Sequence, residues 1–182
     1  MIQYCIDKWE KNKDALRDDI RENPEWKTCD YFYVVNRTVT FILNDGKEIC
    51  ADEDLILYDD RPEWNANRIT EINDGWYQGT LLYLIPRNEY CPAEYDYLMG
   101  FIGYGSCFLC DTLERIHIEG YDFSQVSYEE YLRQKMSETQ VNDYMALCKD
   151  FICGIIKPYN NGWREEPEFD TIESSGSTYS KD

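Results

Sequence analysis

The sequence of 182 residues is poor in histidine and in basic side chains: it has one histidine, His117, and 18 lysines and arginines against 36 aspartates and glutamates. A Cys-His or Ser-His catalytic pair could therefore be built only at His117. The motifs G-x-x-x-x-G-K-[ST], G-x-G-x-x-G after a strand, H-E-x-x-H and G-x-S-x-G are also absent. Nothing here indicates a P-loop nucleotidase, a dinucleotide-binding enzyme, a zincin or an α/β-hydrolase.

Long apolar segments are missing as well. No stretch approaches the roughly 18 consecutive apolar residues that a membrane span needs, and the first residues lack the pattern of a signal peptide. We therefore expect no membrane association and a cytoplasmic location. In a reducing compartment, cysteines serve mostly as small buried hydrophobic residues rather than as disulfides. The cysteines are Cys5, Cys29, Cys50, Cys91, Cys107, Cys110, Cys148 and Cys153.

The formal net charge is -18, and the acidic residues are unevenly spread. Residues 45 to 63 carry 8 acids, and residues 89 to 130 carry 9 acids against Arg115 alone. Such a surface repels nucleic acid and anionic lipid, so no direct nucleic-acid partner is expected. The charge either serves solubility or complements a strongly basic partner, such as the nucleic-acid channel of another protein.

If the second interpretation holds, acidic side chains in these segments would steer the partner and exposed tyrosines would anchor it. The candidate acidic residues are Asp52, Glu53, Asp54, Asp59, Asp60, Glu94, Asp96 and Asp122. The candidate aromatic anchors are Tyr90, Tyr95 and Tyr121.

Periodicity predicts an α+β fold: an antiparallel sheet of three to five strands flanked by an N-terminal and a C-terminal helix. Ile2, Ile6, Trp9, Leu16 and Ile20 indicate an amphipathic first helix that Pro24 ends. The β-branched and aromatic stretch 29 to 46 predicts one long strand, or a hairpin turning at residues 36 and 37. Residues 47 to 74 favour a short strand with a loop or an irregular helix.

The second half of the chain carries clearer signals. Residues 76 to 86 and 95 to 105 predict two neighbouring antiparallel strands, and residues 111 to 118 a short helix. Capping-box patterns start at Ser127 and Ser137, the second before a helix that Pro158 stops. That helix has an apolar stripe of Val141, Tyr144, Met145, Cys148, Ile152 and Ile155. We expect one domain over residues 1 to 163 and a disordered acidic tail over 164 to 182.

The stretch "GYGSCFLCDTLERI", residues 103 to 116, contains a C-x-x-C pair. A zinc site needs four ligands, and a second pair is not evident, so no metal and no cofactor are expected. A redox or nucleophilic pair remains an alternative, because a C-x-x-C can open a helix that lowers the pKa of its first thiol. The favoured interpretation is structural: Cys107 and Cys110 pack where a strand turns into a helix, with Ser106 or Asp111 as the cap.

The block "DGWYQGTLLYLIPRNEYCPAEYDYLMGFIGYGSCFLCDTLERI" resembles a group of small accessory proteins of phages and prophages of Gram-positive bacteria. Their recognisable core is a "QGTLL-x-L/I-IP" strand followed by "YGSCSGCDTL", where this chain has Phe108 and Leu109 in place of Ser-Gly. The similarity covers residues 75 to 116. Phage accessory proteins of this size and acidity include anti-CRISPR proteins, so the resemblance implies an inhibitor of a type II CRISPR nuclease in the host bacterial cytoplasm.

Three functions of different classes remain open at this point. The first is an inhibitor, not an enzyme, that occupies a basic groove of a CRISPR effector nuclease or another basic nucleic-acid-binding protein. The second is an enzyme, either a metal-dependent nuclease with clustered carboxylates or a thiol enzyme using Cys107 or Cys110. The third is a phage structural or assembly protein whose exposed aromatic residues bind copies of itself.

Overall fold

The N-terminal helix α1 (Ile2–Glu22) forms because apolar residues recur on one of its faces. In the computed structural model, which describes residues 1–49, 61–107, 110–122 and 124–156, Cys5, Trp9, Leu16 and Ile20 are buried on this face. Asn23 ends the helix, and the 3-10 turn η1 (Pro24–Lys27) follows. Ile2 and Ile6, expected on the apolar face, are exposed because Cys5 faces the core at that end of the helix.

The stretch from 29 to 46 is helical, so the strand prediction for it is wrong. It contains α2 (Tyr31–Thr38) and the π-helical segment η2 (Val39–Leu43). The Asp30 side chain caps α2 by accepting a hydrogen bond from the Tyr33 amide at 2.8 Å. The buried residues of this stretch include Val34, Val35, Val39, Ile42 and Leu43. Burial of this apolar face outweighs the weak strand preference of β-branched residues.

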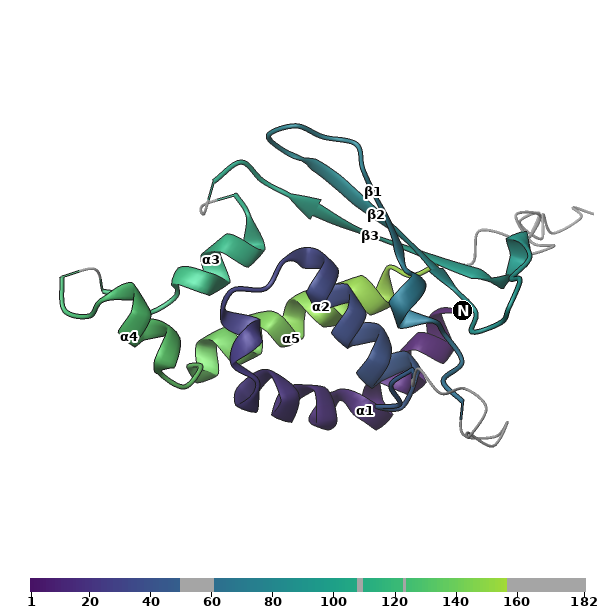
Figure 1. The fold of residues 1–182 in the computed structure, drawn as a ribbon, viewed down its shortest axis with the longest axis horizontal. Coiled ribbons are helices and arrows are strands. Elements are labelled where there is room, and N and C mark those ends of the chain that lie inside the picture. Colours follow the sequence, from purple (N-terminus) through teal and green to yellow (C-terminus); the bar gives the residue numbers. More distant parts are fainter. Residues whose placement is uncertain (50–60, 108–109, 123, 157–182) are drawn as a thin grey trace, which may run out of the picture.

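The sheet has three antiparallel strands in the order β1 (Thr70–Asn73), β2 (Gly79–Pro86) and β3 (Tyr97–Tyr104). The predicted pairing of the last two strands is confirmed, and Tyr83 lies opposite both Glu71 and Gly100. The short 3-10 turns η5 (Ala66–Arg68) and η6 (Glu94–Asp96) precede β1 and β3. Figure 1 shows the sheet on one side of a layer that contains α1, α2 and α5.

Later in the described residues lie the helices α3 (Thr112–Ile118), α4 (Tyr128–Arg133) and α5 (Glu138–Cys153). Both predicted capping boxes are present: the Ser127 and Ser137 side chains cap α4 and α5 reciprocally with Glu130 and Gln140. The fold is therefore α+β with helices α1 and α5 as expected. Within the described residues, no helix combines the length and the apolar character that crossing a membrane requires.

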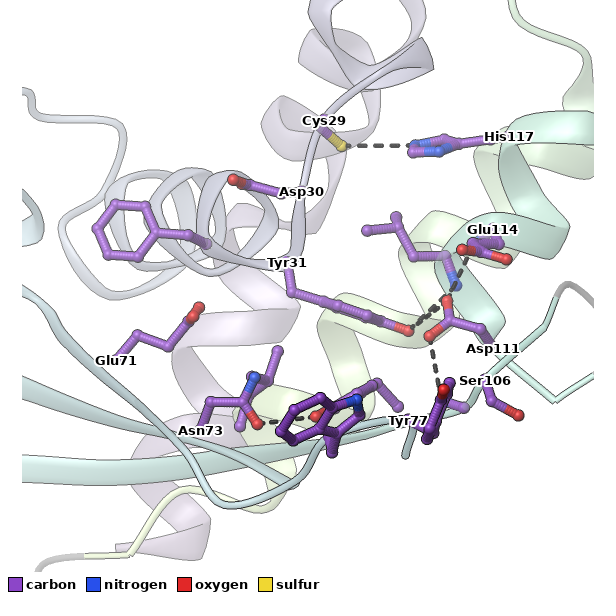
Figure 2. A pocket seen from close by; sticks show the side chains of 16 residues that line it. Cys29, Asp30, Tyr31, Glu71, Asn73, Tyr77, Ser106, Asp111, Glu114 and His117 are labelled. Carbon is purple, nitrogen blue, oxygen red and sulfur yellow. Dashed lines mark hydrogen bonds between the residues drawn. The ribbon is translucent and has the colours of Figure 1, made fainter. Parts of the chain in front are cut away.

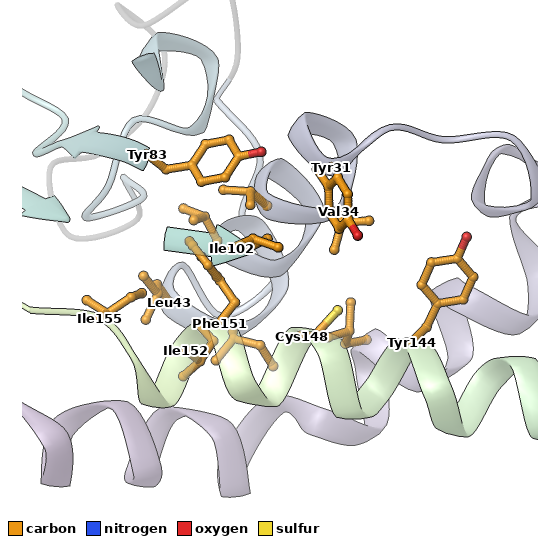
Figure 3. Close-up of a cluster of buried hydrophobic side chains, with 14 of the residues drawn as sticks. Tyr31, Val34, Leu43, Tyr83, Ile102, Tyr144, Cys148, Phe151, Ile152 and Ile155 are labelled. Carbon is orange, nitrogen blue, oxygen red and sulfur yellow. The ribbon is translucent and has the colours of Figure 1, made fainter. Parts of the chain in front are cut away.

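Helix α5 runs through the centre of the core, between α1 and the sheet (Figure 3). Its predicted stripe is buried, and Phe151 meets the Tyr83 ring edge-on, with the ring centroids 5.9 Å apart. Gly100 of β3 leaves room for Phe151, because a Cβ atom there would lie 2.5 Å from the Phe151 ring. The predicted tail, residues 164 to 182, and Pro158 lie outside the described residues.

Candidate functional site

Of the acidic residues expected to meet a partner, the structure describes three, and these lie in two separate turns. Asp52, Glu53, Asp54, Asp59 and Asp60 lie outside the described residues. Glu94 and Asp96 belong to η6, where Asp96 accepts a hydrogen bond from the Ala93 amide at 3.0 Å.

Asp122 lies in the connection between α3 and α4, away from η6. Hydrogen bonds from the Ser124 hydroxyl and amide lower the pKa of its carboxyl below the usual range. Asp122 and Asp96 therefore both have a local role in shaping their own turns.

The three tyrosines expected as anchors are also dispersed. Tyr90 is fully exposed and Tyr95 is 56% exposed, both in the connection between β2 and β3. Tyr121 instead packs against Tyr131 and Tyr128, with ring centroids 4.8 and 5.9 Å away. Tyr121 is thus part of an aromatic cluster rather than an exposed anchor beside the other two.

Cys107 and Cys110 are exposed, so the expectation that they are packed into the protein is wrong. The neighbouring residue occupies the buried position instead: Asp111 is 6% exposed. Its carboxylate caps α3 by accepting from the Glu114 amide at 3.0 Å, as expected for a cap at this position. Of the other described cysteines, Cys5, Cys29 and Cys148 are buried, while Cys91 and Cys153 are exposed.

A groove of about 520 Å³ opens at the end of the sheet opposite the β2–β3 connection. One wall is the sheet end with the β1–β2 loop, and the other is formed by the N-terminal ends of α2 and α3 (Figure 2). We call this cavity the acidic groove. The residues that line it are Cys29, Asp30, Tyr31, Phe32, Glu71, Asn73, Trp76, Tyr77, Leu81, Tyr104, Gly105, Ser106, Asp111, Leu113, Glu114 and His117.

The β1–β2 loop presents two large aromatic side chains at this groove. Trp76 is 89% exposed and Tyr77 is 75% exposed. The loop itself is held firmly, because the Asn73 side chain accepts from the Gly75 amide and from the Tyr104 hydroxyl at 2.9 and 2.8 Å. Gly75 is required here, since a Cβ atom would lie 2.3 Å from the Gln78 carbonyl oxygen. The two aromatic side chains are thus exposed on an ordered loop, as binding anchors are.

Asp111 fixes the opposite wall. Its carboxylate accepts the Tyr31 hydroxyl at 3.0 Å and the Gly105 amide at 3.1 Å, in addition to capping α3. The Leu113 amide in turn donates to the Tyr31 hydroxyl at 3.2 Å. These bonds join α2, α3 and the end of β3, so the wall is preorganised before any partner binds (Figure 2).

The electrostatics of the groove are one-sided. Asp30, Glu71 and Glu114 are exposed in its lining, and Asp111 lies beneath them. Among the described residues, no lysine or arginine lines the groove. Burial lowers the pKa of His117, although Asp111 opposes this, so the imidazole is neutral at pH 7. The lining is therefore negative and suited to a cation.

The contact between Cys29 and His117 in the groove does not indicate a reactive thiol. The Cys29 sulfur lies 4.0 Å from the His117 Nε2 atom (Figure 2). Burial raises the pKa of the Cys29 thiol to about 12, whereas a nucleophilic cysteine needs a lowered pKa. Both groups are neutral, so the pair does not provide a thiolate.

A metal centre is not evident either. Within the part of the chain that the structure describes, no group of three or more histidine, cysteine, aspartate or glutamate side chains is arranged to hold a metal ion. The acidic groove has exposed carboxylates on both walls rather than ligands that converge on one point.

Sequence reasoning missed the acidic groove because its residues come from four separate segments. Asp30 and Glu71 lie outside the two acidic segments, and Trp76 and Tyr77 lie in a stretch interpreted only as the start of a strand. The usable signal in the sequence was the adjacent aromatic pair Trp76 and Tyr77 between Gly75 and Gly79, because closely spaced glycines are typical of a turn. Comparison with protein-family models, curated proteins and solved structures finds no significant match for this chain.

Proposed function

We propose that this protein is a stoichiometric inhibitor that binds a basic, nucleic-acid-handling protein through the acidic groove. The observation that carries this proposal is the position of Trp76 and Tyr77, both largely exposed, beside the carboxylates of Asp30, Glu71 and Glu114. Large aromatic side chains are enriched at the energetic hot spots of protein interfaces, and charged groups beside them add specificity.

The groove suits a lysine or, better, an arginine side chain of the partner. A guanidinium is planar, forms bidentate hydrogen bonds with carboxylates and stacks on aromatic faces. An indole ring is the best aromatic acceptor of a cation, and such contacts strengthen when water is excluded. Trp76 therefore covers the cation while Glu71 and Glu114 neutralise it.

The charge of the whole chain supports the same partner. A net charge of -18 creates a field that attracts a basic surface at long range and accelerates association. The same field repels nucleic acid, so the basic surface and not the bound nucleic acid is the target. A channel that binds DNA or RNA has the lysines and arginines that this groove accepts.

A type II CRISPR nuclease loaded with its guide is the first partner to test. This choice rests on the resemblance of residues 75 to 116 to phage accessory proteins. The nuclease has a positively charged channel for nucleic acid, which fits the chemistry of the acidic groove.

Titration of DNA cleavage tests the proposal. Increasing amounts of the protein are added to a fixed amount of guide-loaded nuclease, and cleaved DNA, intact DNA and intact guide are quantified. We expect cleavage to fall in proportion to the protein added and to end near equimolar amounts, with DNA and guide intact. Full inhibition by a small fraction of one equivalent would indicate an enzyme, and cleavage that persists at large excess would refute inhibition of this nuclease.

A further inference from the structure

The C-x-x-C turn lies beside the acidic groove but is not explained by the proposed function. Cys107 and Cys110 are both exposed, and their sulfur atoms lie 3.0 Å apart. Two hydrogen bonds close the turn: the amides of Cys110 and Asp111 donate to the Cys107 carbonyl oxygen at 2.9 and 2.7 Å. A disulfide bond is about 2.05 Å long, so the two sulfur atoms need to approach by only about 1 Å.

The backbone on both sides of this turn is fixed. The Asp111 carboxylate accepts from the Gly105 amide, which ties the residues before and after the two cysteines to each other. Gly105 packs so closely that a Cβ atom would lie 2.3 Å from the Cys110 carbonyl oxygen. The two cysteines are therefore held close to each other, which is the preorganisation that favours an intramolecular reaction.

We infer that Cys107 and Cys110 form a reversible dithiol site that exchanges with low-molecular-weight disulfides and closes to an intramolecular disulfide. One protein thiolate attacks a sulfur of the small disulfide and forms a mixed disulfide, and one small thiolate leaves. The second protein thiol then loses its proton and attacks the mixed disulfide, and the second small thiolate leaves. The protein loses two electrons and two protons, and the small disulfide becomes two thiols.

The environment of each cysteine selects this pair. Hydrogen bonds from Cys107 and Ser106 lower the pKa of Cys110, which makes Cys110 the first attacking group. Burial instead raises the pKa of Cys5 to about 11 and that of Cys148 to about 12. The buried cysteines are thus protonated and shielded, and cannot compete with the exposed pair.

A single peptide reports the reaction. Trypsin cleaves after Arg87 and Arg115, and the peptide between them contains Cys91, Cys107 and Cys110. The folded, reduced protein is incubated with oxidised glutathione, alkylated and digested, and the peptide is analysed by mass spectrometry. Exposed Cys91 serves as the internal standard, because it has the same access to both reagents.

Compared with the fully reduced and alkylated peptide, we expect the peptide to lack two alkyl groups, with Cys107 and Cys110 joined in a disulfide and Cys91 still alkylated. In Cys107→Ser the ring cannot close, so glutathione should accumulate on Cys110. In Cys110→Ser, glutathione should accumulate on Cys107 more slowly than it does on Cys110 in Cys107→Ser.

Two results would overturn the inference. One is that Cys107 and Cys110 in the folded wild-type protein behave like Cys91, with mixed disulfides that persist and no ring. The other is that the ring forms to the same extent in concentrated urea, which would show that the folded turn contributes nothing. A smaller extent of ring closure in urea supports the inference.

Discussion

The hydroxyl of Tyr31 donates a hydrogen bond to the buried carboxylate of Asp111 at 3.0 Å and so ties the start of α2 to the start of α3. The two residues are 80 positions apart in the sequence. This contact shapes one wall of the acidic groove, and it links the stability of the fold to the geometry of the site.

Replacement of Asp111 by alanine should lower the free energy of unfolding by about 3 kcal/mol, because three donors lose their acceptor and one of them, the Tyr31 hydroxyl, is buried. Asp30→Ala is the matched control: it removes an exposed cap that accepts one amide, and should cost about 1 kcal/mol. Urea unfolding measures both changes, provided that the dependence of the unfolding free energy on urea concentration is the same in all variants. Equal losses in the two variants would show that Asp111 is only a helix cap.

Gly100→Ala should destabilise the protein by about 1 to 3 kcal/mol, because the new methyl group would overlap the Phe151 ring in the core. Gly103→Ala, on the same strand, provides the control, since a Cβ atom there meets nothing within 4 Å. The control should change the free energy of unfolding by less than about 0.5 kcal/mol. Similar midpoints of urea unfolding for the two variants would contradict this packing.

Asp45 should make stability depend on pH in the acidic range. Burial raises the pKa of its carboxyl, but hydrogen bonds from Asn12, Lys8 and Lys11 outweigh this effect and lower it to about 2. A lowered pKa in the folded state gives stabilisation that is present above about pH 4 and is lost as the pH falls toward 2.

Asp45→Asn tests this dependence, because asparagine tolerates the positive φ of 57° at this position. At pH 7 the variant should be less stable by about 1 kcal/mol, a value discounted for the partial exposure of the ion pairs. The difference in unfolding midpoint between the two proteins should shrink between pH 4 and 2. A difference that stays constant over this range would mean that the charge of Asp45 does not contribute.

Trp76→Ala should weaken binding to the guide-loaded nuclease by about 2 kcal/mol, which is roughly thirtyfold in affinity, because the indole covers the bound cation. The comparison is Tyr90→Ala, which removes a fully exposed aromatic side chain at the opposite end of the sheet. Neither change should alter the melting temperature, because both side chains are exposed. Weaker binding by Tyr90→Ala alone would place the interface at the anchor expected from the sequence.

Sequence patterns gave the part of the fold that depends on local signals. The pairing of Gly79–Pro86 with Tyr97–Tyr104 followed from two apolar runs with breakers between them, and the helix starts followed from the capping boxes at Ser127 and Ser137. The helical stretch from Tyr31 was missed because tertiary burial outweighed local propensity. The cap at Asp30 was the local signal that pointed to a helix.

The acidic groove could not be derived in the same way. Glu71, Trp76 and Glu114 meet only because the sheet and α3 are packed together, and no spacing in the sequence encodes that contact. The number of acidic residues per segment pointed to the two segments where they are most frequent. The three carboxylates that share the groove with two aromatic residues come from separate parts of the chain, so this count did not single them out.

In the proposed complex, the carboxylates of Glu71 and Glu114 hold a basic side chain of the partner. The most direct measurement compares the affinity for guide-loaded nuclease of the double variant Glu71→Gln, Glu114→Gln with that of Glu22→Gln, Glu129→Gln, which has the same net charge but keeps the groove intact. We predict that the groove variant loses about 2 to 4 kcal/mol of binding energy and the control less than about 0.5 kcal/mol, because only the former leaves a buried cation without its partner. Equal losses in the two variants would show that overall charge, and not the groove, determines binding, and would contradict the account.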